Sequence, residues 1–116
     1  MMVGLVIAAC AASACGSRPM PAARVGSAEA AVRTARDDGA GALPDASMHL
    51  RLAEQQVATA RRLIDEGEPE RAEWFLVRAE ADATLADALA REAQQKALAD
   101  QVSTRARNLA TEGGEQ

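Results

Sequence analysis

Between Pro69 and Gly113 the chain contains no proline and no glycine. Because these two residues most often interrupt helices, the interval predicts one helix of about 43 residues, roughly 65 Å at a rise of about 1.5 Å per residue. Small apolar residues recur along it at alternating spacings of four and three: Ala72, Leu76, Ala79, Ala83, Ala86, Ala90, Ala93 and Ala97. Such a stripe allows a second helix to approach closely with a left-handed crossing. The rest of the chain is therefore expected to pack around this long helix.

A second helix is predicted from Pro44 and Asp45, because proline is tolerated in the first turn of a helix. Its apolar stripe consists of Leu50, Ala53, Val57, Ala60 and Ile64, with Leu52 and Leu63 beside it. Gly67 stands where a glycine ends a helix. Because the connection to Pro69 is so short, the second and long helices are predicted to be antiparallel neighbours.

A short first helix is predicted from Ser27, a good N-cap residue, to Asp37 and Asp38. Its apolar positions are Ala28, Ala31, Val32 and Ala35, and the segment GAGALPD breaks the chain after it. We expect this helix to pack on a second face of the long helix, which carries Trp74, Val77, Ala81 and Ala88.

The predicted fold is all-α: an antiparallel helical hairpin preceded by a short helix, with a long, coiled-coil-like last helix. The expected organisation is a signal segment over residues 1–14, a flexible tether over 15–26, the alanine-rich helical domain over 27–112 and a disordered tail over 113–116. A chain of 116 residues has room for one such small domain.

The net charge of −4 argues against a nucleic-acid-binding protein, because such proteins carry a basic face. The chain contains one Phe, one Trp and no Tyr, so large aromatic anchors are rare. Alanine buries little area, and the core is therefore expected to be thin.

Both cysteines lie within the first fifteen residues. Cys10 lies inside an uncharged run from Val3 to Ala14, and Cys15 directly follows this run. This run is shorter than the roughly 20 residues that span a bilayer, and it has the length of the apolar region of a secretory signal, about 7–15 residues. The segment AASACGSRPMP resembles a bacterial lipoprotein signal, in which a cysteine after a box of small residues is lipidated and becomes the new N-terminus. We expect lipid attachment at Cys15.

Cys10 is the alternative lipid attachment site. The sequence IAAC places Ile7 where an aliphatic residue is preferred, but it leaves a signal that is too short unless translation starts further upstream. An ordinary cleaved signal, or a disulfide between Cys10 and Cys15, are the remaining alternatives. Because Gly16 follows Cys15, instead of the aspartate that resembles an inner-membrane retention signal, an outer-membrane location is favoured.

The chain shows no pattern typical of catalysis. His49 is the single histidine, and Glu54 is the nearest carboxylate that follows it, so we interpret His49 as a surface or boundary residue. The acidic turn DEGEPE, residues 65–70, lacks the ligand pattern of a calcium loop, and we interpret its carboxylates as solvated capping charges. We therefore predict a protein that is not an enzyme and that has no cofactor, no metal and no small-molecule substrate.

The part of the long helix beyond Arg91 extends past any partner within the chain. Leu98, Val102 and Leu109 form an apolar line there, which Arg105 interrupts. We expect this end to contact either a second copy or an envelope protein, with a frayed and idle end as the alternative. Trp74 is either a core residue under the first helix or an anchor for a partner, because tryptophan is enriched at binding hot spots.

Two family resemblances accompany these patterns. The spacing of Gly67, Ala72, Leu76 and Ala79 looks like the turn and second helix of one tetratricopeptide repeat, but no second copy follows at a period of about 34 residues. The stretch from GSAEAAVRTARDDGAGALPDAS to AEADATLADALA is similar to the bacterial domain of unknown function 4398. That resemblance implies a short, alanine-rich lipoprotein of the cell envelope, related to versions that accompany peptidoglycan-binding domains of the OmpA type.

From these observations we expect a membrane-tethered helical lipoprotein on the periplasmic face, with a structural or adaptor role in the envelope. The alternative is a soluble, exported helical module of tetratricopeptide-like type, which would bind a peptide or protein between its first and long helices.

Overall fold

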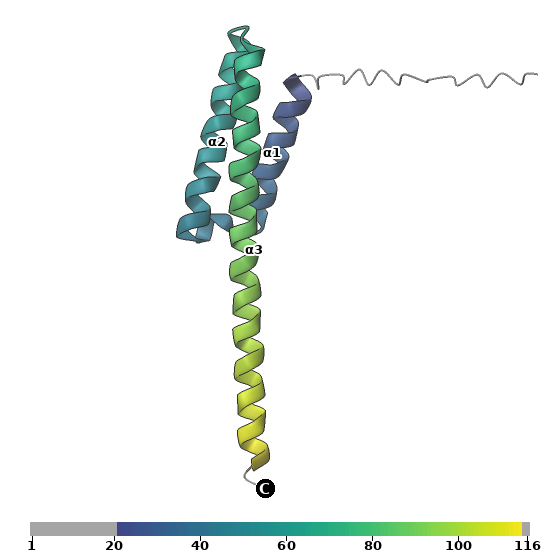
Figure 1. The fold of residues 1–116 in the computed structure, drawn as a ribbon, viewed down its shortest axis with the longest axis vertical. Coiled ribbons are helices and arrows are strands. Elements are labelled where there is room, and N and C mark those ends of the chain that lie inside the picture. The colour runs from purple at the N-terminus through teal and green to yellow at the C-terminus, as the bar shows by residue number, and fades with distance from the viewer. Residues whose placement is uncertain (1–20, 115–116) are drawn as a thin grey trace, which may run out of the picture.

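The computed structural model describes residues 21–114, and this part of the chain is built from helices without a strand. In order they are α1 (Pro21–Asp37), the 3₁₀ turn η1 (Ala40–Ala42), α2 (Pro44–Asp65) and α3 (Pro69–Gly114). Figure 1 shows α1 and α2 on either side of one half of α3, while the other half of α3 extends alone. The predicted all-α fold, with an antiparallel hairpin and a long last helix, is confirmed.

The turn between α2 and α3 depends on Gly67. Its φ of 81° lies in the left-handed region that glycine adopts without strain. The Glu68 N–H donates to the Leu63 carbonyl at 2.8 Å and the Gly67 N–H donates to the Ile64 carbonyl at 3.0 Å. This is the Schellman pattern that ends a helix, and it turns the chain so sharply that α3 runs back along α2.

The core lies along one face of α3, on the stripe that the alternating spacing predicts. The first six residues of the predicted stripe are buried, whereas Ala93 is half-buried and Ala97 is exposed. We call these six the core stripe: Ala72, Leu76, Ala79, Ala83, Ala86 and Ala90. Leu76 is the largest side chain in the described residues that is almost wholly buried. The stripe ends at the level where α1 ends and α2 begins, and within residues 21–114 no residue of α3 beyond Ala90 is buried.

The predicted start of the first helix is wrong by six residues. α1 begins at Pro21, so residues 21–26, which we expected in the tether, are helical. Proline is suited to the first turn of a helix, and the alanines and arginine that follow are strong helix formers. Val25 packs against the core and the Arg24 guanidinium forms an ion pair with Glu80 of α3, so tertiary contacts stabilise this added length.

The expected packing face of the first helix is also wrong. Trp74, Val77, Ala81 and Ala88 are all exposed, and α1 lies instead beside the core stripe, opposite α2 across it. The alanines of the stripe are small enough for two helices to share one narrow face. At the other end, α3 continues through residues 113 and 114, which we expected in a disordered tail.

The core stripe makes a direct stability prediction. Leu76→Asp places a charge at a site that is 1% exposed, and we expect a loss of several kcal/mol in the free energy of unfolding. Ala83→Leu overpacks a close helix crossing, and we expect a loss of about 1–3 kcal/mol. Thermal unfolding followed by circular dichroism measures both losses, at about 4–8 °C per kcal/mol for a domain of this size.

Two matched variants serve as controls. Leu98→Asp and Ala97→Leu make the same changes on the exposed part of α3, and Ala97 continues the spacing of the core stripe. Both should leave the melting temperature within about 4 °C of the wild type, because surface substitutions change stability by less than about 0.5 kcal/mol. Equal losses at positions 76 and 98 would contradict the assigned core.

Candidate functional site

Trp74 is the most exposed of the large apolar residues near the bundled end of α3. Its side chain is 75% exposed, so the interpretation of Trp74 as a core residue under the first helix is wrong. Val77, one turn further along α3, is also exposed. Solvent-exposed tryptophan is rare and is enriched at binding hot spots, which leaves Trp74 as a candidate contact residue.

The three apolar residues predicted on the free end of α3 are exposed in this chain. Leu98 is 60% exposed, Val102 69% and Leu109 61%. Every residue from Gln94 to Gly114 is exposed. Of the large apolar side chains that are exposed in the described residues, six of eight lie on α3: Trp74, Val77, Leu85, Leu98, Val102 and Leu109.

In the bundled half of α3, Trp74, Ala81, Leu85 and Ala88 are exposed on the side opposite the core. A helix turns about 100° per residue, so Ala81 and the buried Ala83 point about 200° apart. From Trp74 onward, every seventh residue of α3 is uncharged. These positions, together with the position four residues after each of them, follow the alternating spacing of four and three that defines a heptad repeat. We call these exposed residues the outer stripe: Trp74, Ala81, Ala88, Gln95, Val102 and Leu109, with Arg78, Leu85, Glu92, Ala99, Ala106 and Gly113. α3 thus carries apolar residues on two faces, and within residues 21–114 α1 and α2 cover one of them.

A polar cluster that the sequence analysis missed joins α2 to α3. The Asp82 carboxylate of α3 contacts two side chains of α2. His49 Nδ1 lies 3.0 Å from Asp82 Oδ1, and Gln56 Nε2 donates to Asp82 Oδ2 at 2.8 Å. The His49 and Asp82 side chains are each 22% exposed. His49 and Gln56 are seven residues apart and therefore lie on the same face of α2. This spacing is the feature of the sequence from which the cluster could have been predicted. The cluster fixes how α2 sits against α3.

Ion pairs connect α1 to both of its neighbours. Arg36 pairs with Glu54 and Glu29 with Arg61, both across a shallow groove between α1 and α2 whose floor includes Val32. Because α1 and α2 are antiparallel, Glu29 of α1 pairs with the later Arg61 of α2, whereas Arg36 pairs with the earlier Glu54. The groove predicted to take a peptide was between the first and long helices, whereas the groove lined by Val32, Glu54 and Arg61 lies between α1 and α2.

Just after the end of α1, the Asp38 carboxylate pairs with Arg91 of α3 at 2.9 Å. Arg91 also donates to Asp87 at 3.0 Å, and this hydrogen bond, together with the charges of Asp87 and Asp38, raises the pKa of the Arg91 guanidinium above its ordinary value. Gln94 donates to the Asp38 carbonyl at 2.7 Å. These contacts hold the end of α1 at the point where α3 leaves the bundle.

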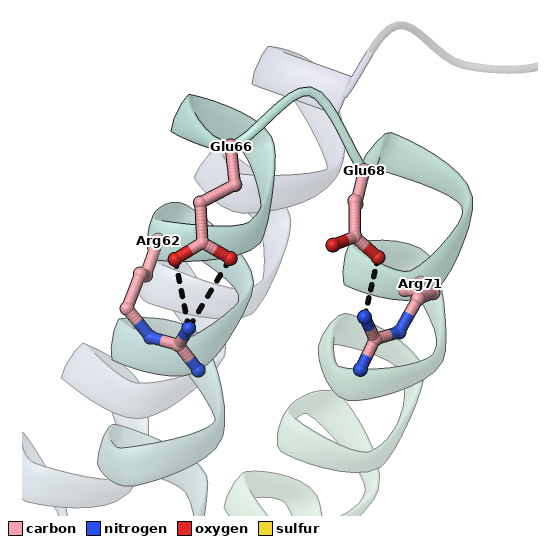
Figure 2. Close-up of polar contacts among 4 residues, drawn as sticks. All are labelled: Arg62, Glu66, Glu68 and Arg71. Atoms are coloured by element: carbon pink, nitrogen blue, oxygen red, sulfur yellow. Dashed lines mark hydrogen bonds and ion pairs between the residues drawn. The ribbon is translucent and has the colours of Figure 1, made fainter.

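The acidic turn is partly neutralised by local arginines. Figure 2 shows that Arg62 bonds both carboxylate oxygens of Glu66, at 2.9 and 3.2 Å, and that Arg71 pairs with Glu68. Each pair belongs to one end of one helix, and the glutamates on either side of Gly67 have separate partners. Across residues 21–114 there is no group of three or more His, Cys, Asp or Glu arranged to hold a metal ion.

Both candidate lipid attachment sites, Cys15 and Cys10, lie outside the described residues. Among the described helices, none is both long enough and apolar enough to cross a membrane.

The geometry defines a class of protein: a three-helix alanine-rich bundle in which the last helix extends beyond the others. The chain belongs to the family of the domain of unknown function DUF4398, whose family model matches residues 23–102. The match covers α1 from Ala23, all of α2, and α3 as far as Val102, which confirms the resemblance found in the sequence. No curated protein and no solved structure matches the chain.

The Asp82 cluster makes a stability prediction. Asp82→Ala removes the partner of both His49 and Gln56, and a half-buried polar group without a partner costs about 1–3 kcal/mol. We expect the free energy of unfolding, measured by urea titration, to fall by that amount. Asp100→Ala is the matched control on the exposed part of α3 and should change it by less than about 0.5 kcal/mol.

A double-mutant cycle separates the cluster from simple truncation. In the Asp82→Ala background, His49→Ala should cost less than it costs alone, because its interaction is already lost. Strict additivity of the two losses would show that the His49–Asp82 contact contributes nothing to stability.

Proposed function

We propose that this protein is a lipid-anchored helical protein of the cell envelope, tethered through Cys15 on the periplasmic face of a membrane, with the outer membrane favoured. In this role the bundle is the base of a rod, and the free end of α3 reaches away from the membrane to make structural or adaptor contacts.

The observation that carries the proposal is the direction of the helices. Pro21, the first described residue, lies at the same end of the molecule as the turn at Gly67, and α3 leaves the bundle at the opposite end (Figure 1). A lipid attached shortly before Pro21 would therefore hold the turn end of the bundle, and the bare half of α3 would point away from it.

Distances along the chain agree with this arrangement. Five residues lie between Cys15 and Pro21, and because an extended chain spans at most about 3.6 Å per residue, the two are at most roughly 20 Å apart. The exposed stretch from Gln94 to Gly114 is about 30 Å of helix at about 1.5 Å per residue. A bundle held close to the bilayer would thus present its free helix well beyond the lipid headgroups.

Family membership is consistent with the proposal. The resemblance noted in the sequence is to short envelope lipoproteins, and the family itself carries no assigned activity. The apolar run and small-residue box before Cys15 are the sequence evidence for lipid attachment. The free end of α3 carries exposed Leu98, Val102 and Leu109, which suit contacts with another protein.

The proposal predicts that a fatty-acid analogue supplied to cells labels the protein and that Cys15→Ala abolishes the label. The matched control, Cys10→Ala, changes the other cysteine and should keep the label. The mass of the intact protein from the membrane fraction should correspond to a mature chain that begins at lipidated Cys15. A mature N-terminus after residue 15, or a label that survives Cys15→Ala, would refute the proposed anchor.

A further inference from the structure

We propose that the outer stripe of α3 is covered by the outer stripe of a second copy of this chain, running antiparallel, in a symmetric dimer. This inference goes beyond the proposed function and does not depend on lipid attachment.

The first argument is that the outer stripe is a second complete seam. Its twelve positions are all exposed, and they follow the heptad spacing from Trp74 to Gly113, over both the bundled and the bare halves of α3. Sustained spacing of this kind is typical of a helix that packs along its whole length against another helix. α1 and α2 cannot supply that helix, because both lie on the core side.

Charge decides the direction of the second copy. In a parallel pair in register each residue faces its own copy, so Arg78 would meet Arg78 and Glu92 would meet Glu92 in the seam. Like charges that face each other oppose association. In an antiparallel pair these contacts disappear, because each layer joins different residues.

One antiparallel register matches side-chain sizes and polarity layer by layer. It is the register that places Ala88 beside Ala99 of the second copy. Leu85 then lies beside Val102, and Ala81 beside Ala106. Glu92 meets Gln95, whose amide group can donate to the carboxylate. This polar layer falls at the centre of the pair and opposes slippage, as buried polar residues do in coiled coils.

The ends of the same register are also complementary. Trp74 comes opposite Gly113, which has no side chain to meet the indole ring. Arg78 comes opposite Leu109, with Glu112 one turn away. Leu98 and Arg105 flank the stripe instead of lying in it, so Arg105 does not interrupt the seam as it interrupts the shorter line of Leu98, Val102 and Leu109. The bare half of each α3 is thereby covered by the bundled half of the other.

The arrangement closes on itself. Each copy contributes the same stripe, so the interface is isologous and produces a dimer instead of an open chain of subunits. The two bundles lie at opposite ends of the pair, and the start of each α1 lies at an outer end. Two lipid anchors in one membrane would therefore hold the dimer along the bilayer, whereas a single copy is the form whose free α3 end points away from the membrane.

The test uses the full-length chain with Cys10→Ser and Cys15→Ser, purified in mild detergent, so that lipid attachment and native thiols play no part. Sedimentation equilibrium should give twice the chain mass of 12.1 kDa. Val102→Asp, in the outer stripe, should weaken the dimer at least tenfold. Thr104→Asp adds the same charge to the same exposed segment outside the stripe, and should leave the dissociation constant within about twofold.

Single cysteines then determine direction and register. Under mild oxidation, a mixture of the Ala88→Cys and Ala99→Cys chains should form a disulfide-linked pair that neither chain forms alone. In the proposed register two copies of position 88 are about 16 Å apart, at about 1.5 Å per residue, and a disulfide requires Cα atoms within about 7 Å. Linkage of Ala88→Cys to itself would indicate a parallel pair and overturn the proposal. A monomer at 100 µM, or equal effects of Val102→Asp and Thr104→Asp, would overturn it as well.

Discussion

The close approach of three helices along a narrow row of alanines is the constraint on which the rest of the structure depends. The core stripe of α3 receives α2 on one side and α1 on the other, and larger side chains at positions such as Ala79 or Ala83 would hold both helices away. Because alanine has no side-chain rotamers to lose, this core is formed at little cost in side-chain entropy. It also gains little apolar burial, so the bundle must rely on additional contacts to choose one arrangement.

Polar contacts supply that choice. A face of alanines fits a neighbouring helix in several registers, because each small side chain resembles the next. Asp82, held by His49 and Gln56, admits only one position of α2 along α3. The pairs of Asp38 with Arg91 and of Arg24 with Glu80 do the same for α1. The small core thus determines how closely the helices approach, and the polar side chains determine the register in which they pack along one another.

Local signals were sufficient to predict most of the fold. Pro44, Gly67 and Pro69 mark helix ends by backbone chemistry that does not depend on the rest of the molecule, and the structure has α2 and α3 starting at these prolines. The face on which α1 packs could not be predicted in this way, because α3 carries two apolar faces and periodicity does not state which one is buried. The start of α1 at Pro21 and the Asp82 cluster depend on contacts between helices, which a linear pattern does not contain.

Alanine at the core also bears on how such a chain changes over generations. Eleven of the sixteen buried apolar residues within residues 21–114 are alanine, and only glycine is smaller. Almost every substitution at these positions therefore enlarges a side chain, so random change pushes the helices apart and very rarely brings them closer. The exposed face of α3 meets no such restriction within one copy. We therefore expect substitutions to be tolerated unequally: rarely at the buried positions, and more often at the exposed positions, where they can change which partners the protein contacts.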